Sequence, residues 1–286
     1  MKKVAVCLHG ELRDWNTCSK IFSLWNFANP NIHFDFFLAT WGDKYTLGLD
    51  KYLPLKQISL HSVGDMYGEM NNSLKYYYET QSKKVTTSTK EYQHYYTYLL
   101  SKAVKLTKLS TSKYDAAITI RPDIFVFESF FDFLIKKFNN NLPDEHNNSI
   151  PFGDNNIYSS SGTVYSQDSL FCGADTVFVG SLKGITEFSK MFEDIFVKQK
   201  HPPLHLHKLQ AEYLNHKRIY NSADSSITGK INRKVQKKRN NHPSTAALEE
   251  LYVTYGKDLY RKNLKEEITA ILIKHTKNEK SLKKYL

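Results

Sequence analysis

The segment 114–127, with the sequence YDAAITIRPDIFVF, constrains the fold more than any other part of the chain. Its mostly apolar run at 116–120 is typical of a short strand that is buried on both faces, as in a parallel sheet. The run stops at Arg121-Pro122-Asp123, so a cation and a carboxylate follow where the strand ends. In open α/β sheets, ligands bind just outside the carboxyl ends of the strands. The sequence therefore predicts a ligand site that contains Arg121 and Asp123.

Pro122 affects how the two charged side chains are presented. Because proline lacks an N–H and biases the preceding residue towards extended geometry, we expect Arg121 and Asp123 to be held apart and rigidly oriented. A carboxylate presented in this way can bind a divalent cation that carries a diphosphate. The alternative is an ion pair that only closes the end of the strand.

Strands and helices alternate through most of the chain, which predicts an α/β fold with a mostly parallel central sheet flanked by helices. We expect strands at 3–8, 34–40, 57–63 and 116–120, with short strands within 150–180, and helices at 14–27, 88–109, 129–138 and 181–198. A further helix is expected after Pro202-Pro203, and it carries His205, His207, Gln210 and Glu212. Tyrosines recur at helical spacing within 88–109, so we interpret most of them as core residues and not as a base-stacking surface.

A polar segment, His9-Gly10-Glu11-Leu12-Arg13, follows the first strand. Gly10 permits a tight turn or a close approach of the backbone to a ligand. Arg13 lies where the next helix is expected to begin, and helix N-termini favour phosphate. The alternative for Arg13 is a solvated surface arginine.

The charge balance favours anionic partners, because 40 Lys and Arg stand against 29 Asp and Glu, for a net charge of +11. Charge alone does not distinguish nucleotide phosphates, acidic glycans, membrane surfaces and nucleic acid. The three cysteines have no paired spacing, so neither a disulfide framework nor a zinc site is suggested. No apolar run is long enough to span a bilayer, and the first residues become polar too soon for a signal peptide. We therefore expect a cytoplasmic protein.

The chain changes character near residue 220. We predict one domain over 1–220 and a basic, helical C-terminal appendage over 221–286. The run 229–239 contains six cations and no acid: Lys230, Arg233, Lys234, Lys237, Lys238 and Arg239. This run motivates an alternative function, nucleic-acid binding, although no aromatic residues interleave with the cations.

The motifs VAVCLHGELRDW, DFFLATWGD, YDAAITIRPDIFVF and QDSLFCGADTVFVGS occur in this order and together cover roughly residues 3–219. In these motifs the chain resembles small GT-A-type glycosyltransferases that build capsule or lipopolysaccharide glycans. Such proteins begin with a strand followed by Gly-x-x-Arg, and have Arg-x-Asp where other GT-A enzymes have Asp-x-Asp. Gly10, Arg13, Arg121 and Asp123 match this pattern.

The resemblance implies a hexosyltransferase that moves sugar from a nucleotide-sugar donor to a glycan or lipid-linked glycan, in the cytoplasm or at the inner membrane surface. The residues implied for donor binding are His9, Gly10, Arg13, Thr40 and Arg121. Asp123 would bind Mn or Mg, although Arg121 stands in place of the first carboxylate and could partly replace the metal. Asp168 is the candidate catalytic base, with a loop cap or a sugar-hydroxyl contact as its alternative. His205 and His207 are too close in sequence to share a metal on one helix face, but one could be a late metal or phosphate ligand.

Overall fold

The computed structural model describes residues 1–13, 15–42, 48–81, 93–126, 128–139, 152–159, 163–165, 170–172, 177–198, 206–223, 227 and 229–231. Its main sheet consists of β1 (Lys2–His9), β2 (Ile32–Trp41), β3 (Leu55–His61), β4 (Ala116–Ile120), β6 (Asn156–Ser159), β9 (Val177–Gly180) and β10 (Tyr220–Ala223). The helices are α1 (Trp15–Ser23), α2 (Trp25–Ala28), α3 (Val63–Glu69), α4 (Asn72–Gln81), α5 (Gln93–Thr107), α6 (Glu128–Asn139), α7 (Leu182–Ser189), a π-helix η2 (Phe192–Val197) and α8 (Leu206–His216).

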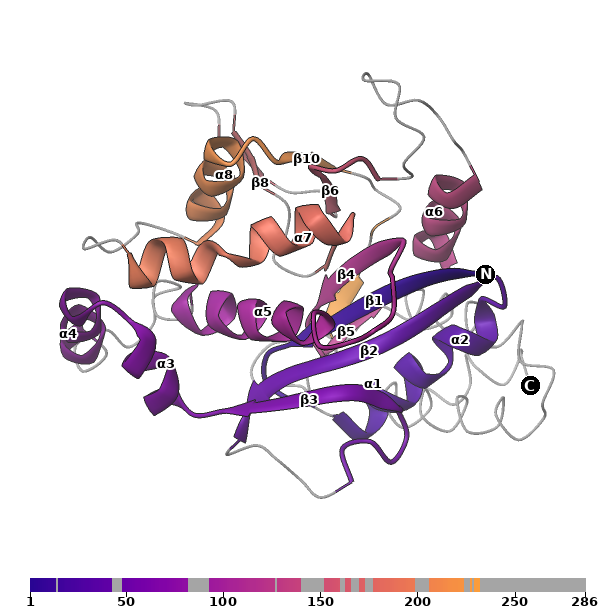
Figure 1. The fold of residues 1–286 in the computed structure, drawn as a ribbon, viewed down its shortest axis with the longest axis horizontal. Helices are drawn as coiled ribbons and strands as arrows, with labels where there is room; N and C mark the ends of the chain where they lie inside the picture. The colour runs from indigo at the N-terminus through magenta and orange to yellow at the C-terminus, as the bar shows by residue number, and fades with distance from the viewer. Residues whose placement is uncertain are drawn as a thin grey trace, which may run out of the picture.

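The seven strands lie in the order β10-β6-β9-β4-β1-β2-β3 (Figure 1). β1 pairs in parallel with both β2 and β4, and β2 pairs in parallel with β3. Within this sheet β9 runs against its neighbours β4 and β6, while β10 is parallel to β6. The predicted α/β class with a mostly parallel sheet is confirmed. The carboxyl ends of β1, β2, β3 and β4 consequently meet at one edge of the sheet.

The alternation of side chains along β1 divides the core into two layers. Val4, Val6 and Leu8 pack on the face that α1, α2 and α6 cover. Ala5 and Cys7 pack on the opposite face, under α5 and α7 (Figure 1). Because both faces of the strand are buried, its sequence reads as one continuous apolar run.

Two predicted helices are interrupted. The helix expected at 14–27 breaks at Leu24, whose N–H donates to the carbonyl of Ile21, three residues back and 3.1 Å away, so that α1 ends in a tighter turn before α2 begins. The helix expected at 181–198 begins at Leu182, capped by Ser181, and changes to the π-helix η2. Neither α3 nor α4 was predicted, although Ser62 and Asp65 form a capping box at the start of α3.

Two short antiparallel pairs complete the described structure: β5 (Ile124–Val126) with β11 (Gly229–Ile231), and β7 (Thr163–Tyr165) with β8 (Leu170–Cys172). β10 spans the predicted boundary at residue 220 and belongs to the main sheet. The helical interpretation is wrong for 229–231, because these residues pair with β5 as a strand. The cations from Arg233 to Arg239 lie outside the described residues.

Candidate functional site

The segment after β1 lies directly against the turn after β4. The two strands are neighbours with Leu8 in register with Ile120, so the chain leaves both at the same edge. Gly10 has a φ of +130°, which strongly favours glycine, and a Cβ there would lie 3.5 Å from Cδ of Pro122. The Thr40 hydroxyl, at the end of β2, donates to the Gly10 carbonyl at 2.9 Å. Three adjacent strands thus fix the position of this segment.

Arg121 and Asp123 form a bidentate ion pair. Nε of Arg121 donates to Oδ1 of Asp123 at 3.0 Å, and Nη2 donates to Oδ2 at 2.8 Å. The expectation that Pro122 holds the two side chains apart is wrong. Pro122 instead occupies the second position of a turn in which the Ile124 N–H donates to the Arg121 carbonyl at 3.1 Å, which brings the side chains on either side of the proline together.

Arg13 extends this pair into a chain of alternating charges. Its Nη1 lies 3.7 Å from Oδ2 of Asp123, and its Nε donates to Oε2 of Glu11 at 3.1 Å. The Arg13 side chain is 46% exposed, whereas that of Asp123 is 2% exposed and that of Arg121 is 19% exposed. Arg13 is therefore the cation of this cluster that a ligand in solution can reach most directly.

His9 is a buried, neutral neighbour of the cluster. Burial and the positive charge of Arg121 lower the pKa of His9 from 6.5 to about 3. Its ring packs edge-on against Tyr96 of α5, with centroids 4.9 Å apart, and its Nδ1 has no hydrogen-bond partner among the described residues. At neutral pH the imidazole can exchange hydrogen bonds but adds no charge to the site.

The side chains around Asp123 do not fit a divalent cation. Mg and Mn need several oxygen ligands, usually one or two carboxylates together with water and phosphate oxygens. Both oxygens of Asp123 already bind Arg121, and Oδ2 also faces Arg13. Among the residues that the structure describes, no three His, Cys, Asp or Glu side chains are grouped so that they could hold a metal. What these residues offer a phosphate is two guanidinium groups.

The structure thus brings together six residues that the sequence predicted for the site: His9, Gly10, Arg13, Thr40, Arg121 and Asp123. Of these, Thr40 is fully buried and supports the Gly10 carbonyl. Asp168 and His205 lie outside the described residues. The sequence interpretation gave Glu11 and Tyr96 no role in the site. An acid two residues before Arg13 was a usable signal for Glu11, but nothing in the tyrosine spacing identified the contact of Tyr96 with His9.

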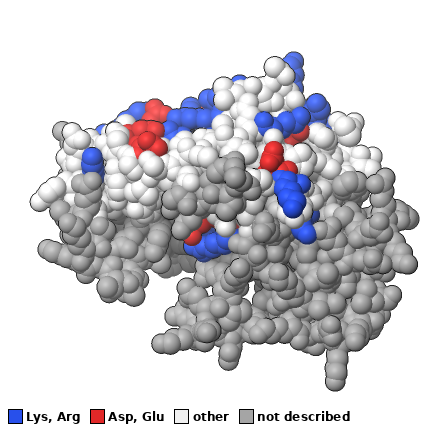
Figure 2. All heavy atoms as spheres, turned by 90° about the horizontal axis from the view of Figure 1, so that it is seen from below, with Lys and Arg blue, Asp and Glu red and all other residues white. Residues whose placement is uncertain are grey.

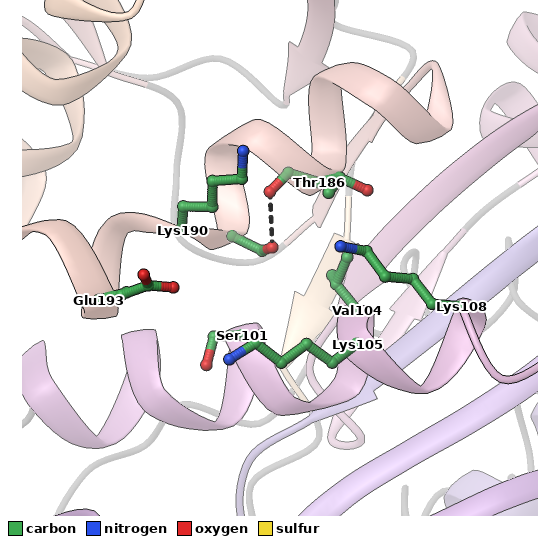
Figure 3. A pocket seen from close by; sticks show the side chains of 8 residues that line it. Ser101, Val104, Lys105, Lys108, Thr186, Lys190 and Glu193 are labelled. Carbon is green, nitrogen blue, oxygen red and sulfur yellow. Dashed lines mark hydrogen bonds between the residues drawn. The ribbon is translucent and has the colours of Figure 1, made fainter. Parts of the chain in front are cut away.

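A separate cavity of about 70 Å³ lies between α5 and the α7–η2 segment (Figure 3). Lys105, Lys108 and Lys190 line it, together with Glu193. These lysines stand at the C-terminal ends of α5 and α7, where the helix dipole stabilises cations in the absence of any ligand. α5 leads into the amino end of β4, so the cavity lies away from the Arg121 turn. The positions of these lysines are accounted for without a ligand.

The face in Figure 2 gives no support to the nucleic-acid alternative from the described residues, and the cations from Arg233 to Arg239, on which that alternative mostly rests, lie outside them. On the face in Figure 2, Lys and Arg side chains of the described residues lie beside Asp and Glu and form no broad basic patch. Nucleic-acid binding relies on such clustered cations. Among the residues that the structure describes, no helix is long and apolar enough to cross a membrane.

No family model matches the chain, and no curated protein matches its sequence. Among solved structures, it is similar to mouse xyloside xylosyltransferase 1 in its apo form, with 12% identity over 78% of this chain and 84% of that one and a TM-score of 0.40. It is also similar to galactosyltransferase LgtC in complex with donor and acceptor sugar analogues, with 12% identity over 79% of this chain and 69% of that one and a TM-score of 0.34. It is similar as well to the structure of an active-site mutant of LgtC, with 14% identity over 79% of this chain and 68% of that one and a TM-score of 0.35.

TM-scores as low as these do not define a shared fold, so the class of this protein rests on its own topology and site. A mostly parallel sheet has helices on both faces, and two arginines and a buried carboxylate meet at the carboxyl ends of adjacent strands. These features define an α/β protein with a cluster of two arginines and a carboxylate at the usual ligand edge of the sheet.

Proposed function

We propose that this protein is a nucleotide-sugar-dependent glycosyltransferase with a GT-A-like fold. The observation that carries the proposal is the cluster of Arg13, Arg121 and Asp123 at the carboxyl ends of β1 and β4. The Gly-x-x-Arg and Arg-x-Asp motifs lie more than a hundred residues apart in the chain, yet Arg13 lies 3.7 Å from Asp123. Two separate sequence motifs that meet at one ligand edge support a common function.

The chemistry of glycosyl transfer suits this cluster. As the bond between the sugar and the diphosphate breaks, negative charge grows on the departing phosphate oxygens while the anomeric carbon becomes cationic. Fixed guanidinium groups stabilise that growing negative charge, because charge-assisted contacts to phosphate are strong and need no reorganisation during the reaction. Arg121 is held in place by Asp123, and Arg13 faces solvent, where the diphosphate arrives. Asp168 remains the candidate base for the acceptor hydroxyl.

Finer features of the proposal rest on the sequence resemblance and on the net charge of +11. They are a hexose as the transferred sugar, an acceptor glycan or lipid-linked glycan of the capsule or lipopolysaccharide kind, and action in the cytoplasm with peripheral contact at the anionic inner membrane surface. The cations from Arg233 to Arg239 would make that contact, since each Lys or Arg near an anionic leaflet contributes about 1 kcal/mol.

A thermal-shift screen against UDP-, GDP-, CMP- and dTDP-sugars tests the proposal. A donor present at about 100 times its Kd stabilises the native state by about 2.7 kcal/mol, which raises the Tm measurably. The donor that binds should then release its nucleotide when a glycan acceptor is added. Arg13→Gln should reduce the shift, because a donor that binds ten- to a hundredfold more weakly stabilises the native state by only about 0.4–1.4 kcal/mol at the same concentration. Lys108→Gln removes a charge at the other end of α5 and should preserve the shift. If no nucleotide sugar shifts the Tm or is consumed, the proposed function is wrong.

A further inference from the structure

Both carboxylate oxygens of Asp123 are occupied by contacts with arginine side chains. Its carboxylate is almost completely buried, and each of its oxygens accepts a hydrogen bond from Arg121 at 3.0 Å or less. A divalent cation would have to displace this bidentate pair and leave the partly buried Arg121 without its counter-charge, which is costly. The charge of the buried Asp123 carboxylate is therefore already neutralised by Arg121, and a metal ion would have to replace that arginine.

The local charge also disfavours a metal. Once Glu11 has left Arg13, the groups Arg121, Arg13 and Asp123 sum to +1, from two positive groups and one negative group. With Glu11 still paired to Arg13 the sum is zero. An Asp-x-Asp pair with one divalent cation sums to zero, from two negative charges and a charge of +2. The arginine cluster therefore presents an anion with at least as much positive charge as a metal-loaded carboxylate pair does. A dication added to it would be repelled by two guanidinium groups close by.

Arg13 is the group that can exchange its partner. Its 3.7 Å contact with Asp123 is too long for a hydrogen bond, and its other partner, Glu11, is 47% exposed. An exposed ion pair of this kind contributes little and can be replaced by a phosphate. The incoming ligand therefore competes with Glu11, and not with the buried Asp123.

We infer that the donor diphosphate is neutralised by Arg13, supported by Arg121, without a divalent cation, and that Asp123 is a positioning residue that orients both guanidinium groups. This inference rests on the proposed function, because it assumes a nucleoside diphosphate at the site. It assigns Glu11 the role of a displaceable counter-ion that occupies Arg13 in the absence of donor.

Calorimetric titration of the full chain with UDP, GDP, CDP and dTDP, in EDTA and again in MnCl₂, tests the inference. At least one nucleoside diphosphate should bind with the same Kd in both buffers. Arg13→Gln should weaken that binding about ten- to a hundredfold in EDTA, as expected for the loss of a charge-assisted contact. Glu11→Gln should tighten it by up to about fivefold, because it removes an exposed competitor for Arg13. Lys108→Gln, which loses the same charge away from the site, should bind like the wild type.

The positioning role of Asp123 has its own readout. Asp123→Asn should weaken binding of the nucleoside diphosphate by the same factor in EDTA and in MnCl₂, while the corresponding nucleoside without phosphate binds as it does to the wild type. A merely structural role would weaken the nucleoside as well, and would overturn the assignment.

Two other outcomes are distinguishable. If a nucleoside diphosphate binds only with Mn, or if Glu11→Gln weakens binding, the metal-free inference is overturned while the proposed function stands. If no nucleoside diphosphate and no nucleotide sugar binds in either buffer, the proposed function fails, and the inference fails with it.

Discussion

The Arg121–Asp123 ion pair should contribute to folding as well as to ligand binding, and a double-mutant cycle measures how much. Arg121→Gln, Asp123→Asn and the double variant remove the charges; Asn keeps the size of the aspartate side chain, and Gln is shorter than arginine but remains polar. The pair makes two charge-assisted hydrogen bonds, at 3.0 and 2.8 Å, with side chains 19% and 2% exposed. Hydrogen bonds to charged groups contribute about 1.5–3 kcal/mol each, and the amides retain part of one bond, so we expect a coupling energy of about 2 kcal/mol.

The chain contains a matched control for this cycle. Lys183 and Asp154 lie at the same 2.8 Å separation but are 60% and 57% exposed. Their coupling, measured with Lys183→Gln and Asp154→Asn, should be about 0.2–1 kcal/mol, because water screens exposed pairs. Urea unfolding at pH 7 gives the free energy of unfolding of each variant. If the coupling of Arg121 with Asp123 does not exceed that of the control pair, then burial does not strengthen this bidentate contact, and the argument that a metal cannot displace it loses its basis.

Three further predictions concern other parts of the molecule. Gly10→Ala should cost about 1–2 kcal/mol and weaken nucleoside diphosphate binding, because an L-residue at φ +130° is strained and the loop that carries Arg13 must shift; urea unfolding and calorimetry measure the two effects. Burial opposes ionisation of Asp194, but hydrogen bonds from Lys198, Lys217 and Tyr213 lower its pKa to about 2. Its stabilising contribution is therefore present above the unfolded value of 3.8 and is lost as the pH falls towards 2, so Asp194→Asn should lose about 1–2 kcal/mol at pH 7 and show a smaller fall in stability between pH 4 and pH 2 than the wild type. The third prediction concerns five cations outside the described residues: Arg233, Lys234, Lys237, Lys238 and Arg239. When all five are changed to Gln, salt-sensitive binding of the protein to anionic vesicles should disappear, while transfer to a soluble acceptor should persist. Continued vesicle binding would contradict the membrane contact.

Much of the fold could be predicted because strands that are buried on both faces have mostly apolar sequences, which are easily recognised. β1, β2 and β4 are covered on both faces, so each is mostly apolar and ends where the chain becomes polar, although β2 also contains His33 and Asp35. The ends of these runs located the polar cluster, since parallel neighbours share a carboxyl edge. Thr40 was implied for donor binding by the resemblance, but its role in fixing the Gly10 carbonyl required knowing that the two loops meet.

The remaining features depend on contacts between distant segments, which periodicity does not record. The break at Leu24 and the change to a π-helix at Phe192 lie inside stretches whose composition suits one continuous helix. Asp194 links η2 to α8 and to the residue that follows it. Its carboxylate accepts a hydrogen bond from the Tyr213 hydroxyl at 2.9 Å and forms an ion pair with Lys217. Neither partner is near in sequence, so no local pattern indicated where the helix would change its winding.

The difference between a metal ligand and an arginine-bound carboxylate was equally hidden in the sequence, because Arg-Pro-Asp suits both. The deciding feature is the turn closed by the Ile124 N–H on the Arg121 carbonyl, which makes Asp123 face Arg121. That turn leads directly into β5, whose partner β11 comes from the C-terminal part of the chain, with Ile231 in register with Ile124. The predicted boundary at residue 220 therefore separates two strands that pair immediately after Asp123. Residues 229–231, which composition alone assigned to an appendage, thus pair with the strand that directly follows the carboxylate. Asp123 in turn pairs with the arginines that we propose bind the diphosphate.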